Sequence, residues 1–258
     1  MAIGEPPDHD RRRTLLGLAG LGVAGLGLGA SAAQAIGPRS KVGIGHLKHG
    51  GDWDHRPDAL RRMLWETGRR TSIEVARDAT AVAPADDSLF DQPLLVLTGT
   101  EAMPRFSDED RARLQRHLRF GGLLWIDAAA PGAPFLHSAL GELEAILGGQ
   151  PLERLPKEHV MFKSFFLLDK VVGRIADDTR LFGLDLSDRT SVLVTRCDVL
   201  GALERDRFGT WKFECEPGGN RQRELAMRFA VNLLMYATCL DYKTDQVHIP
   251  FIMKKKRR

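Results

Sequence analysis

The chain has 258 residues, of which 43% are hydrophobic and 28% are charged, with a formal net charge of +3 at pH 7. This composition excludes a disordered chain, a collagen and a disulfide scaffold, and the length suits one large or two small domains with a substantial core. Five basic residues occupy positions 254–258, so the charge is a tail and the rest of the chain is slightly acidic. We therefore expect no nucleic-acid partner.

The N-terminus carries the pattern of an export signal. Arg11, Arg12 and Arg13 precede a charge-free run of small and apolar residues over 15–33, and Ala33-Gln34-Ala35 supplies a signal-peptidase site. The arginine pair resembles a twin-arginine signal over residues 1–35, which predicts a periplasmic or exported protein. The alternative is an uncleaved membrane anchor, but a Gly- and Ala-rich run is weakly hydrophobic for a span.

Two further features bear on location. The basic tail over residues 244–258 is interpreted as a solvated terminus, with peripheral contact to anionic lipid headgroups as the alternative. An exported chain could form one disulfide among Cys197, Cys215 and Cys239, but their spacing does not decide the pairing. Burial of these cysteines as small apolar residues is the equal alternative.

Hydrophobic patterning predicts strands alternating with helices along the chain. Expected strands cover residues 41–46, 71–75, 93–99, 123–127 and 191–195, with a short edge strand at 211–213. Expected helices cover residues 57–68, 107–120, 138–147 and 224–239, and residues 152–185 are the least regular part. Such alternation predicts an α/β three-layer sandwich around a mostly parallel sheet, in one domain over residues 37–243.

The loop after the first expected strand, residues 45–57, is the predicted centre of the functional site. In an open α/β sheet, ligands lie beyond the carboxyl ends of the strands. Polar or aromatic residues at or near these ends are therefore the candidate ligand-binding residues: Asp52, Trp53, Thr98, Asp127 and Asp198. The alternative is that each aspartate only caps a turn or helix, and that the tryptophan packs the loop onto the sheet.

The histidines of the same loop suggest a second chemistry. His46, His49 and His55, together with Asp52, offer imidazole and carboxylate ligands suited to zinc, iron or manganese. Their spacing matches no established metal motif, so ordinary loop histidines are the preferred interpretation. His159 is a further candidate, either in an acid/base pair with Glu158 or as a partner of a backbone carbonyl.

Several segments, in order, resemble domain-of-unknown-function family 4159, whose members look like class I glutamine amidotransferases in fold. They are residues 50–53 (GGDW), 71–73 (TSI), 94–99 (LLVLTG), 121–127 (GGLLWID), 158–162 (EHVMF), 197–201 (CDVLG) and 230–236 (AVNLLMY). The resemblance covers about residues 42–250 and implies a flavodoxin-like or amidotransferase-like sandwich. At 158–162 the family usually has Asp and Pro where this chain has Glu158 and Val160.

The amidotransferase comparison also implies where a nucleophile is missing. In that superfamily, the strand after the double-glycine turn ends in an elbow bearing a cysteine. Here the strand ends Trp125-Ile126-Asp127 and continues with alanines, so no thiol or hydroxyl is available there. We therefore expect an exported binding module for a small polar ligand or a protein partner, with a metal-dependent hydrolase using the His/Asp loop as the alternative.

Overall fold

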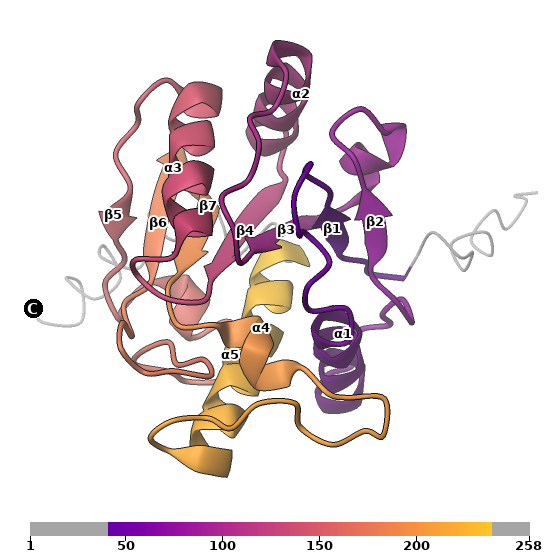
Figure 1. Cartoon of the computed structure of the whole chain (residues 1–258), viewed down its shortest axis with the longest axis vertical. Helices are drawn as coiled ribbons and strands as arrows, with labels where there is room; N and C mark the ends of the chain where they lie inside the picture. Colours follow the sequence, from indigo (N-terminus) through magenta and orange to yellow (C-terminus); the bar gives the residue numbers. More distant parts are fainter. Residues whose placement is uncertain (1–40, 239–258) are drawn as a thin grey trace, which may run out of the picture. The chain divides into compact units, whose positions relative to one another are not determined.

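The computed structural model describes residues 41–238, which form one seven-stranded sheet covered by helices (Figure 1). The strand order is β2-β1-β3-β4-β7-β6-β5. The first five strands in this order are parallel: β2 (Thr80–Val82), β1 (Gly45–Leu47), β3 (Leu94–Gly99), β4 (Leu123–Ala128) and β7 (Arg189–Thr195). The other side of the sheet is formed by β6 (Phe182–Leu186), which pairs antiparallel with β7, and by β5 (Glu153–Arg154), which pairs antiparallel with β6.

The helices cover both faces of the sheet (Figure 1). On one face lie α1 (Ala59–Arg70), α4 (Val199–Leu203) and α5 (Gly219–Thr238), which contact one another. On the other face lie α2 (Asp108–Arg119) and α3 (Pro134–Leu147). Short 3-10 turns occur at Asp87–Asp91 and Val160–Phe162. The expected α/β architecture with a mostly parallel sheet and helices on either side is confirmed.

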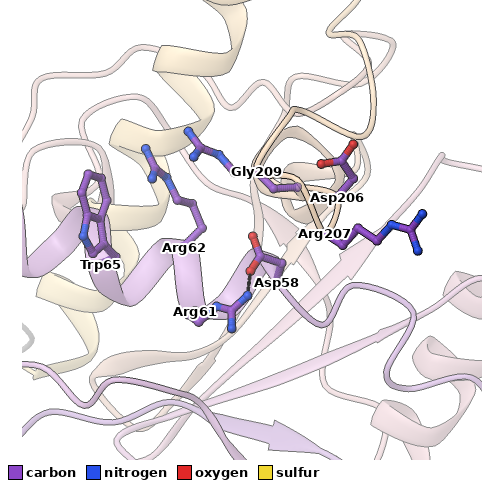
Figure 2. A pocket seen from close by; sticks show the side chains of 8 residues that line it. Asp58, Arg61, Arg62, Trp65, Asp206, Arg207 and Gly209 are labelled. Carbon is purple, nitrogen blue, oxygen red and sulfur yellow. Dashed lines mark hydrogen bonds and ion pairs between the residues drawn. The ribbon is translucent and has the colours of Figure 1, made fainter.

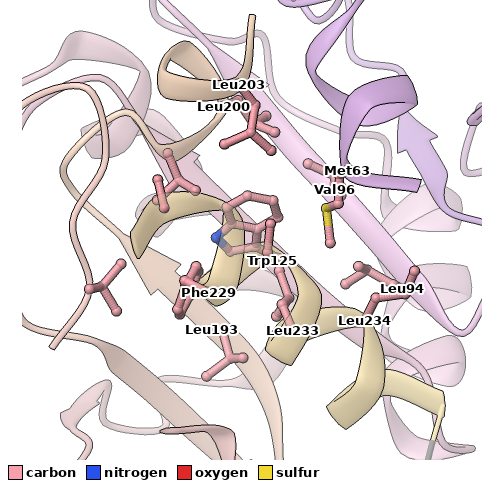
Figure 3. Close-up of a cluster of buried hydrophobic side chains, with 14 of the residues drawn as sticks. Met63, Leu94, Val96, Trp125, Leu193, Leu200, Leu203, Phe229, Leu233 and Leu234 are labelled. Atoms are coloured by element: carbon pink, nitrogen blue, oxygen red, sulfur yellow. The ribbon is translucent and has the colours of Figure 1, made fainter. Parts of the chain in front are cut away.

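The central strands β3 and β4 are buried along their whole length, as their continuous apolar runs predict for a parallel sheet covered on both faces. Trp125 of β4 lies at the centre of the core on the α5 side, where it meets Phe229 edge-on at 6.2 Å between ring centroids (Figure 3). Its indole N–H donates to Thr195 Oγ1 of β7 at 2.9 Å, so the core side chain is also tied to a strand end.

Local signals placed several boundaries correctly. Ser107 caps α2 by accepting the N–H of Asp110 at 3.1 Å, and three acidic residues occupy the first turn, where the helix dipole favours them. The helix ends before Gly121, whose φ of +116° suits a residue without Cβ. α3 and α5 begin at Pro134 and Gly219, each earlier than the apolar pattern predicted.

Two expected strands are wrong. Residues 71–75 contribute only a single bridge between Val75 and Val42, and the strand beside β1 is instead Thr80–Val82, where no strand was expected. Residues 211–213 likewise contribute only one bridge, Trp211 to Arg205. A short helix, α4, was not expected at all. These elements are too short for periodicity to detect, and sheet pairing or helix packing defines them.

No helix within residues 41–238 is long and apolar enough to cross a membrane. The predicted export signal over residues 1–35, the basic tail over residues 244–258 and Cys239 lie outside the described residues. Cys197 and Cys215 are both buried and unpaired.

Candidate functional site

Asp127, the penultimate residue of β4, holds helix α4 against the carboxyl edge of the sheet. Thr195 Oγ1 donates to its Oδ1 at 2.6 Å, and the N–H of Val199 donates to the same oxygen at 3.1 Å. The N–H of Leu200 donates to Oδ2 at 2.7 Å. The first amides of a helix have no partner within the helix, so a buried carboxylate satisfies them and complements the positive end of the helix dipole.

The environment of Asp127 favours its neutral form. The side chain is 2% exposed, and burial is the main cause that raises the pKa of Asp127 from 3.8 to about 7. The nearby charge of Asp198 raises it further, whereas the hydrogen bonds from Leu200, Thr195 and Val199 act in the opposite direction. This carboxyl group therefore titrates near neutral pH.

Asp198 forms the turn between β7 and α4 in a left-handed conformation, with φ 54° and ψ 59°. Asp and Asn adopt this region more readily than other residues with a side chain. Its Oδ1 accepts the N–H of Gly201 at 2.9 Å, and its own N–H donates to Ala128 O at 2.9 Å. A Cβ on Gly201 would lie 2.2 Å from the Asp198 carboxylate, so this cap requires glycine there.

Two arginines neutralise Asp198 from distant parts of the chain. Arg56 Nη2 donates to Oδ2 at 3.0 Å from the end of the loop after β1, and Arg174 Nε donates to the same oxygen at 2.6 Å. Both guanidinium groups also lie over the ring of Phe213, at 4.5 and 5.6 Å from its centroid. Asp198 and Arg56 are buried, so the pair fixes the loop end to the β7–α4 turn.

The loop after β1 is attached to the end of β3 by two side chains. His49 donates from Nε2 to Thr98 O at 3.0 Å and accepts the N–H of Gly51 at Nδ1 at 3.1 Å. Asp52 accepts the N–H of Thr100 at 2.8 Å and that residue's hydroxyl hydrogen. These hydrogen bonds lower the pKa of Asp52 against the opposing effect of burial. The loop is therefore a fixed part of the carboxyl edge.

His46 and Thr98 are two further polar residues at the carboxyl ends of the strands, on the face of the sheet that α5 covers. Thr98 donates its hydroxyl to Asp127 O at 3.2 Å. His46 is 5% exposed and packs edge-on against Trp53 at 4.9 Å between ring centroids, and burial lowers the pKa of His46 to about 4. Its Nε2 has no hydrogen-bond partner among the residues that the structure describes. The imidazole is thus neutral at pH 7.

The structure brings most of the predicted residues to one edge of the sheet. Asp52, Thr98, Asp127 and Asp198 are linked there by the contacts above, and Trp53 packs on His46 in the same loop. The common edge follows from parallel pairing, because Thr98 of β3 pairs with Asp127 of β4.

His159 lies elsewhere. It is hydrogen-bonded by Nε2 to Thr190 Oγ1 at 3.1 Å, and Thr190 in turn donates to Asp185 Oδ1 at 2.5 Å. Thr190 is at the start of β7 and Thr195 at its end, about 16 Å apart at the usual rise of ~3.3 Å per residue. His159 is therefore at the opposite edge of the sheet from Asp127, and burial lowers its pKa to about 4.

The three loop histidines do not form a metal-binding group. Within residues 41–238, no three His, Cys, Asp or Glu side chains gather in an arrangement that would hold a metal ion. His49 uses both ring nitrogens in hydrogen bonds within the protein, and His55 Nδ1 lies 3.1 Å from Asp52 O. The histidines do not converge as the metal-site alternative requires, because each ring is turned toward a backbone group or a neighbouring ring.

Sequence reasoning missed the arginines that complete this network. Arg56 and Arg174 carry no motif, and only the fold brings them to Asp198. One signal was available: Arg56 precedes Pro57 and so is held extended just before a helix. Gly173, next to Arg174, became informative only with the structure, where a Cβ at this position would lie 2.0 Å from Cys197 O and prevent the close approach of the two backbone segments.

The fold and this edge define the class of protein as a mostly parallel α/β sandwich with an internally bonded polar network at its strand ends. More specifically, the chain belongs to the family described as domain of unknown function DUF4159, whose model matches residues 43–238. The resemblance noted in the sequence is thereby confirmed at the level of the family. No curated protein matches the chain.

The buried acid predicts a pH dependence. The folded protein keeps the Asp127 proton between about pH 4 and pH 7, where the unfolded chain has released it, so this group makes folding less favourable as the pH rises. We expect Asp127→Asn to remove this contribution, worth up to about 4 kcal/mol at ~1.4 kcal/mol per pKa unit. Urea unfolding from pH 4.5 to pH 8 measures it.

The readout is the difference between wild type and Asp127→Asn at each pH. His46 and His159, whose pKa values are lowered to about 4, change stability in the opposite sense in both proteins and cancel in this difference. A difference that stays constant with pH would contradict a raised pKa for Asp127.

A second prediction concerns the ion pair at the turn. Asp198→Asn keeps the left-handed conformation and one acceptor but leaves Arg56 buried without its counter-charge, so we expect a loss of about 3–5 kcal/mol in unfolding free energy. The matched control is Asp87→Asn, whose exposed carboxylate pairs with Arg113 and should contribute about 0–1 kcal/mol. Equal losses in the two variants would show that the buried pair is not what fixes the turn.

Proposed function

We propose that the chain is an exported, amidotransferase-like binding module that holds a small polar ligand at the carboxyl edge of its sheet without covalent chemistry. A protein partner is the alternative occupant. The observation that carries the proposal is the β7–α4 turn. The resemblance placed the elbow after β4, where the next helix begins only at Pro134. A strand, a left-handed residue and a helix instead follow one another after β7, as in a nucleophile elbow, and the residue at that turn is Asp198.

The amides of this turn are already in use. In a nucleophile elbow, the backbone N–H after the nucleophile helps to stabilise an oxyanion. Here the N–H groups of Val199 and Leu200 donate to the carboxyl group of Asp127. Asp198 itself accepts from two arginines and a backbone amide. The turn therefore offers neither a nucleophile nor free donors for a reaction intermediate.

The nearest thiol supports the same proposal. Cys197 directly precedes Asp198 but is fully buried. Burial raises its pKa well above 9, and the carboxyl groups of Asp127 and Asp198 raise it further. A reactive cysteine needs partial exposure and a positive environment that lowers its pKa. Cys197 has the opposite environment, so it is a packing residue.

The strand order supports an amidotransferase-like or flavodoxin-like assignment. The parallel strands β2-β1-β3-β4-β7 follow the 2-1-3-4-5 order of a doubly wound sheet. In such sheets the crevice lies where the order reverses, between β1 and β3. The loops that leave these two strands are joined here by Asp52 and Thr100. This crevice is where we place the ligand.

Several groups near the crevice remain accessible. Trp53 and His55 are partly exposed, and Asp54 and Glu101 are exposed. Lys48 Nζ lies 5.8 Å from the Trp53 ring centroid. An aromatic face beside acidic and basic groups suits a small polar ligand. The export and periplasmic location in this proposal rest on the sequence of residues 1–35 alone.

The thiol provides the direct test of a function without covalent chemistry. We expect iodoacetamide at pH 7.5 to leave Cys197 unmodified in the native protein and to modify it fully after unfolding in guanidinium, because burial suppresses the thiolate. Peptide mapping by mass spectrometry separates the three cysteines. Rapid alkylation of native Cys197 would overturn the proposal, since it would reveal an activated thiol at the turn.

Metal content tests the alternative, a metal-dependent hydrolase that uses the loop after β1. Because the histidine rings are turned toward other groups, we expect the purified protein to contain well below one equivalent of metal and EDTA to leave its melting temperature unchanged. One equivalent of zinc, iron or manganese that is lost in both His46→Ala and His49→Ala would instead favour the metal-dependent hydrolase over the binding module.

A further inference from the structure

A second hollow lies outside the strand-end network, between helix α1 and the hairpin formed by residues 205–211 (Figure 2). Its volume is about 360 Å³, and arginines dominate its walls. Figure 2 shows Arg62 and Trp65 rising from α1 on one side of the view, and the loop that carries Asp206 and Gly209 on the other. The lining residues are Asp58, Arg61, Arg62, Trp65, Arg205, Asp206, Arg207 and Gly209.

The guanidinium groups of this hollow are held in place by tryptophan rings. That of Arg62 lies 4.0 Å from the ring centroid of Trp65 and 5.6 Å from that of Trp211. The Arg205 guanidinium lies 4.1 Å from Trp211, and Arg223 lies 4.4 Å from the same ring. Stacking on aromatic faces restricts these side chains while leaving donors in the guanidinium plane for other partners.

The positive charge is only partly neutralised within the protein. Arg61 pairs with Asp58, and Arg62 pairs with Glu66. Neither Arg205 nor Arg207 makes an ion pair with a carboxylate of residues 41–238. Figure 2 shows Arg207 directed away from Arg61 and Arg62, so Arg205 is the uncompensated charge beside the stacked pair.

The hydrogen bonds and the pKa of Arg62 also indicate that the positive charge of Arg62 and Arg205 is incompletely compensated. The Nε atoms of Arg62 and Arg205 are buried without a hydrogen-bond partner among the described residues. Burial lowers the pKa of Arg62, Glu66 raises it, and the charge of Arg205 lowers it again. Buried donors normally find partners, and neighbouring like charges repel. The buried Nε atoms are out of reach of a ligand in the hollow, so what an anion there would relieve is the repulsion between the two guanidinium groups.

The hairpin that forms one wall of the hollow is held by hydrogen bonds of its own. Asp206 Oδ1 accepts the N–H groups of Phe208 and Thr210, each at 2.9 Å. Gly209 takes a φ of +80°, as the turn requires. Asp206 is thus engaged with its own turn, and the Arg205–Trp211 bridge closes the hairpin. A preformed wall reduces the ordering that binding would need.

We propose that this hollow binds a small ligand through an oxyanion, either a phosphate or a carboxylate group, with Arg62 and Arg205 as the principal donors. The planar guanidinium fork matches both oxyanions. The size of the hollow fits a small molecule, since ligand pockets usually span about 300–1,000 Å³. The site is separate from the crevice between β1 and β3, so this inference does not depend on the proposed function.

The test is titration calorimetry of the full chain in a phosphate-free HEPES buffer at low salt, with pyrophosphate and citrate as probes. We expect saturable one-to-one binding of at least one probe, weakened by added KCl. Arg205→Gln should raise the dissociation constant about tenfold or more, because a charge-assisted pair is lost. The dissociation constant of Arg205→Lys should lie between those of the wild type and Arg205→Gln, since lysine keeps the positive charge but not the planar set of guanidinium donors.

Two further variants serve as a control outside the hollow and as a second test of its lining. Arg77→Gln, at an exposed arginine outside the hollow, should leave affinity within about twofold of wild type. Arg61→Gln removes an exposed lining charge and should weaken binding without unfolding the protein, which covers the case in which Arg205→Gln destabilises the hairpin. The melting temperature of each variant, measured without ligand, verifies that it is folded.

Each outcome decides the proposal. Binding of pyrophosphate alone assigns a phosphate ligand, and binding of citrate alone assigns a polycarboxylate. Equal weakening by Arg205→Gln and Arg77→Gln, or full affinity in both Arg205→Gln and Arg61→Gln, overturns the site and attributes binding to diffuse charge, including the basic residues 254–258. Failure of both probes to bind the wild type at millimolar concentration also overturns it.

Discussion

The contact between the carboxyl group of Asp127 and the first amides of α4 organises the carboxyl edge of this protein. It joins the end of β4 to the helix that follows β7, and Thr195 ties the same carboxyl to the β7 strand itself. The left-handed turn at Asp198 follows from this docking, because the chain must reverse within a few residues to place two amides on one carboxyl group. Arg56 and Arg174 then neutralise the turn, and Arg56 fixes the loop that leaves β1.

This arrangement explains why a geometry associated with covalent catalysis carries none of its usual chemistry here. A strand–turn–helix elbow presents one side chain and the backbone amide that follows it toward the same space. In this chain the side chain is a carboxylate bound to two arginines, and the amides are bound to a second carboxyl. Replacing a nucleophile by aspartate alone would place two negative charges side by side in a buried site. The two arginines and the raised pKa of Asp127 together resolve that conflict.

The parts of the fold that sequence predicted are those that local chemistry determines. The strands over 94–99 and 123–128 are continuous apolar runs, and the cap at Ser107 needs only its own helix. The common edge for Asp52, Asp127 and Asp198 followed from the expectation of parallel strands. What failed depends on tertiary pairing. β2 has three residues, two of them exposed, and becomes a strand only beside β1. The position of His159 was not predictable, because it depends on the contact with Thr190 at the start of β7, 31 residues away in the sequence.

The roles of individual residues were harder to predict than their positions, because a role depends on partners that are distant in sequence. Asp198 and Arg56 are 142 residues apart, and Arg62 meets Trp211 only after α1 has packed beside the 205–211 hairpin. From the sequence, Arg62 and Trp65 on α1 have the spacing of a solvent-facing helix surface.

The two clusters of arginines differ in whether carboxylates of the protein neutralise their positive charge. Arg56 and Arg174 share the carboxylate of Asp198 and are engaged within the protein. Arg205, stacked on Trp211 and unpaired with any carboxylate of the described chain, is not. Clustered charge that the fold does not neutralise is stable only if solvent or a ligand compensates it. This difference gives the arginines at the strand ends a structural role, and it is the reason for proposing a ligand at the hollow beside α1.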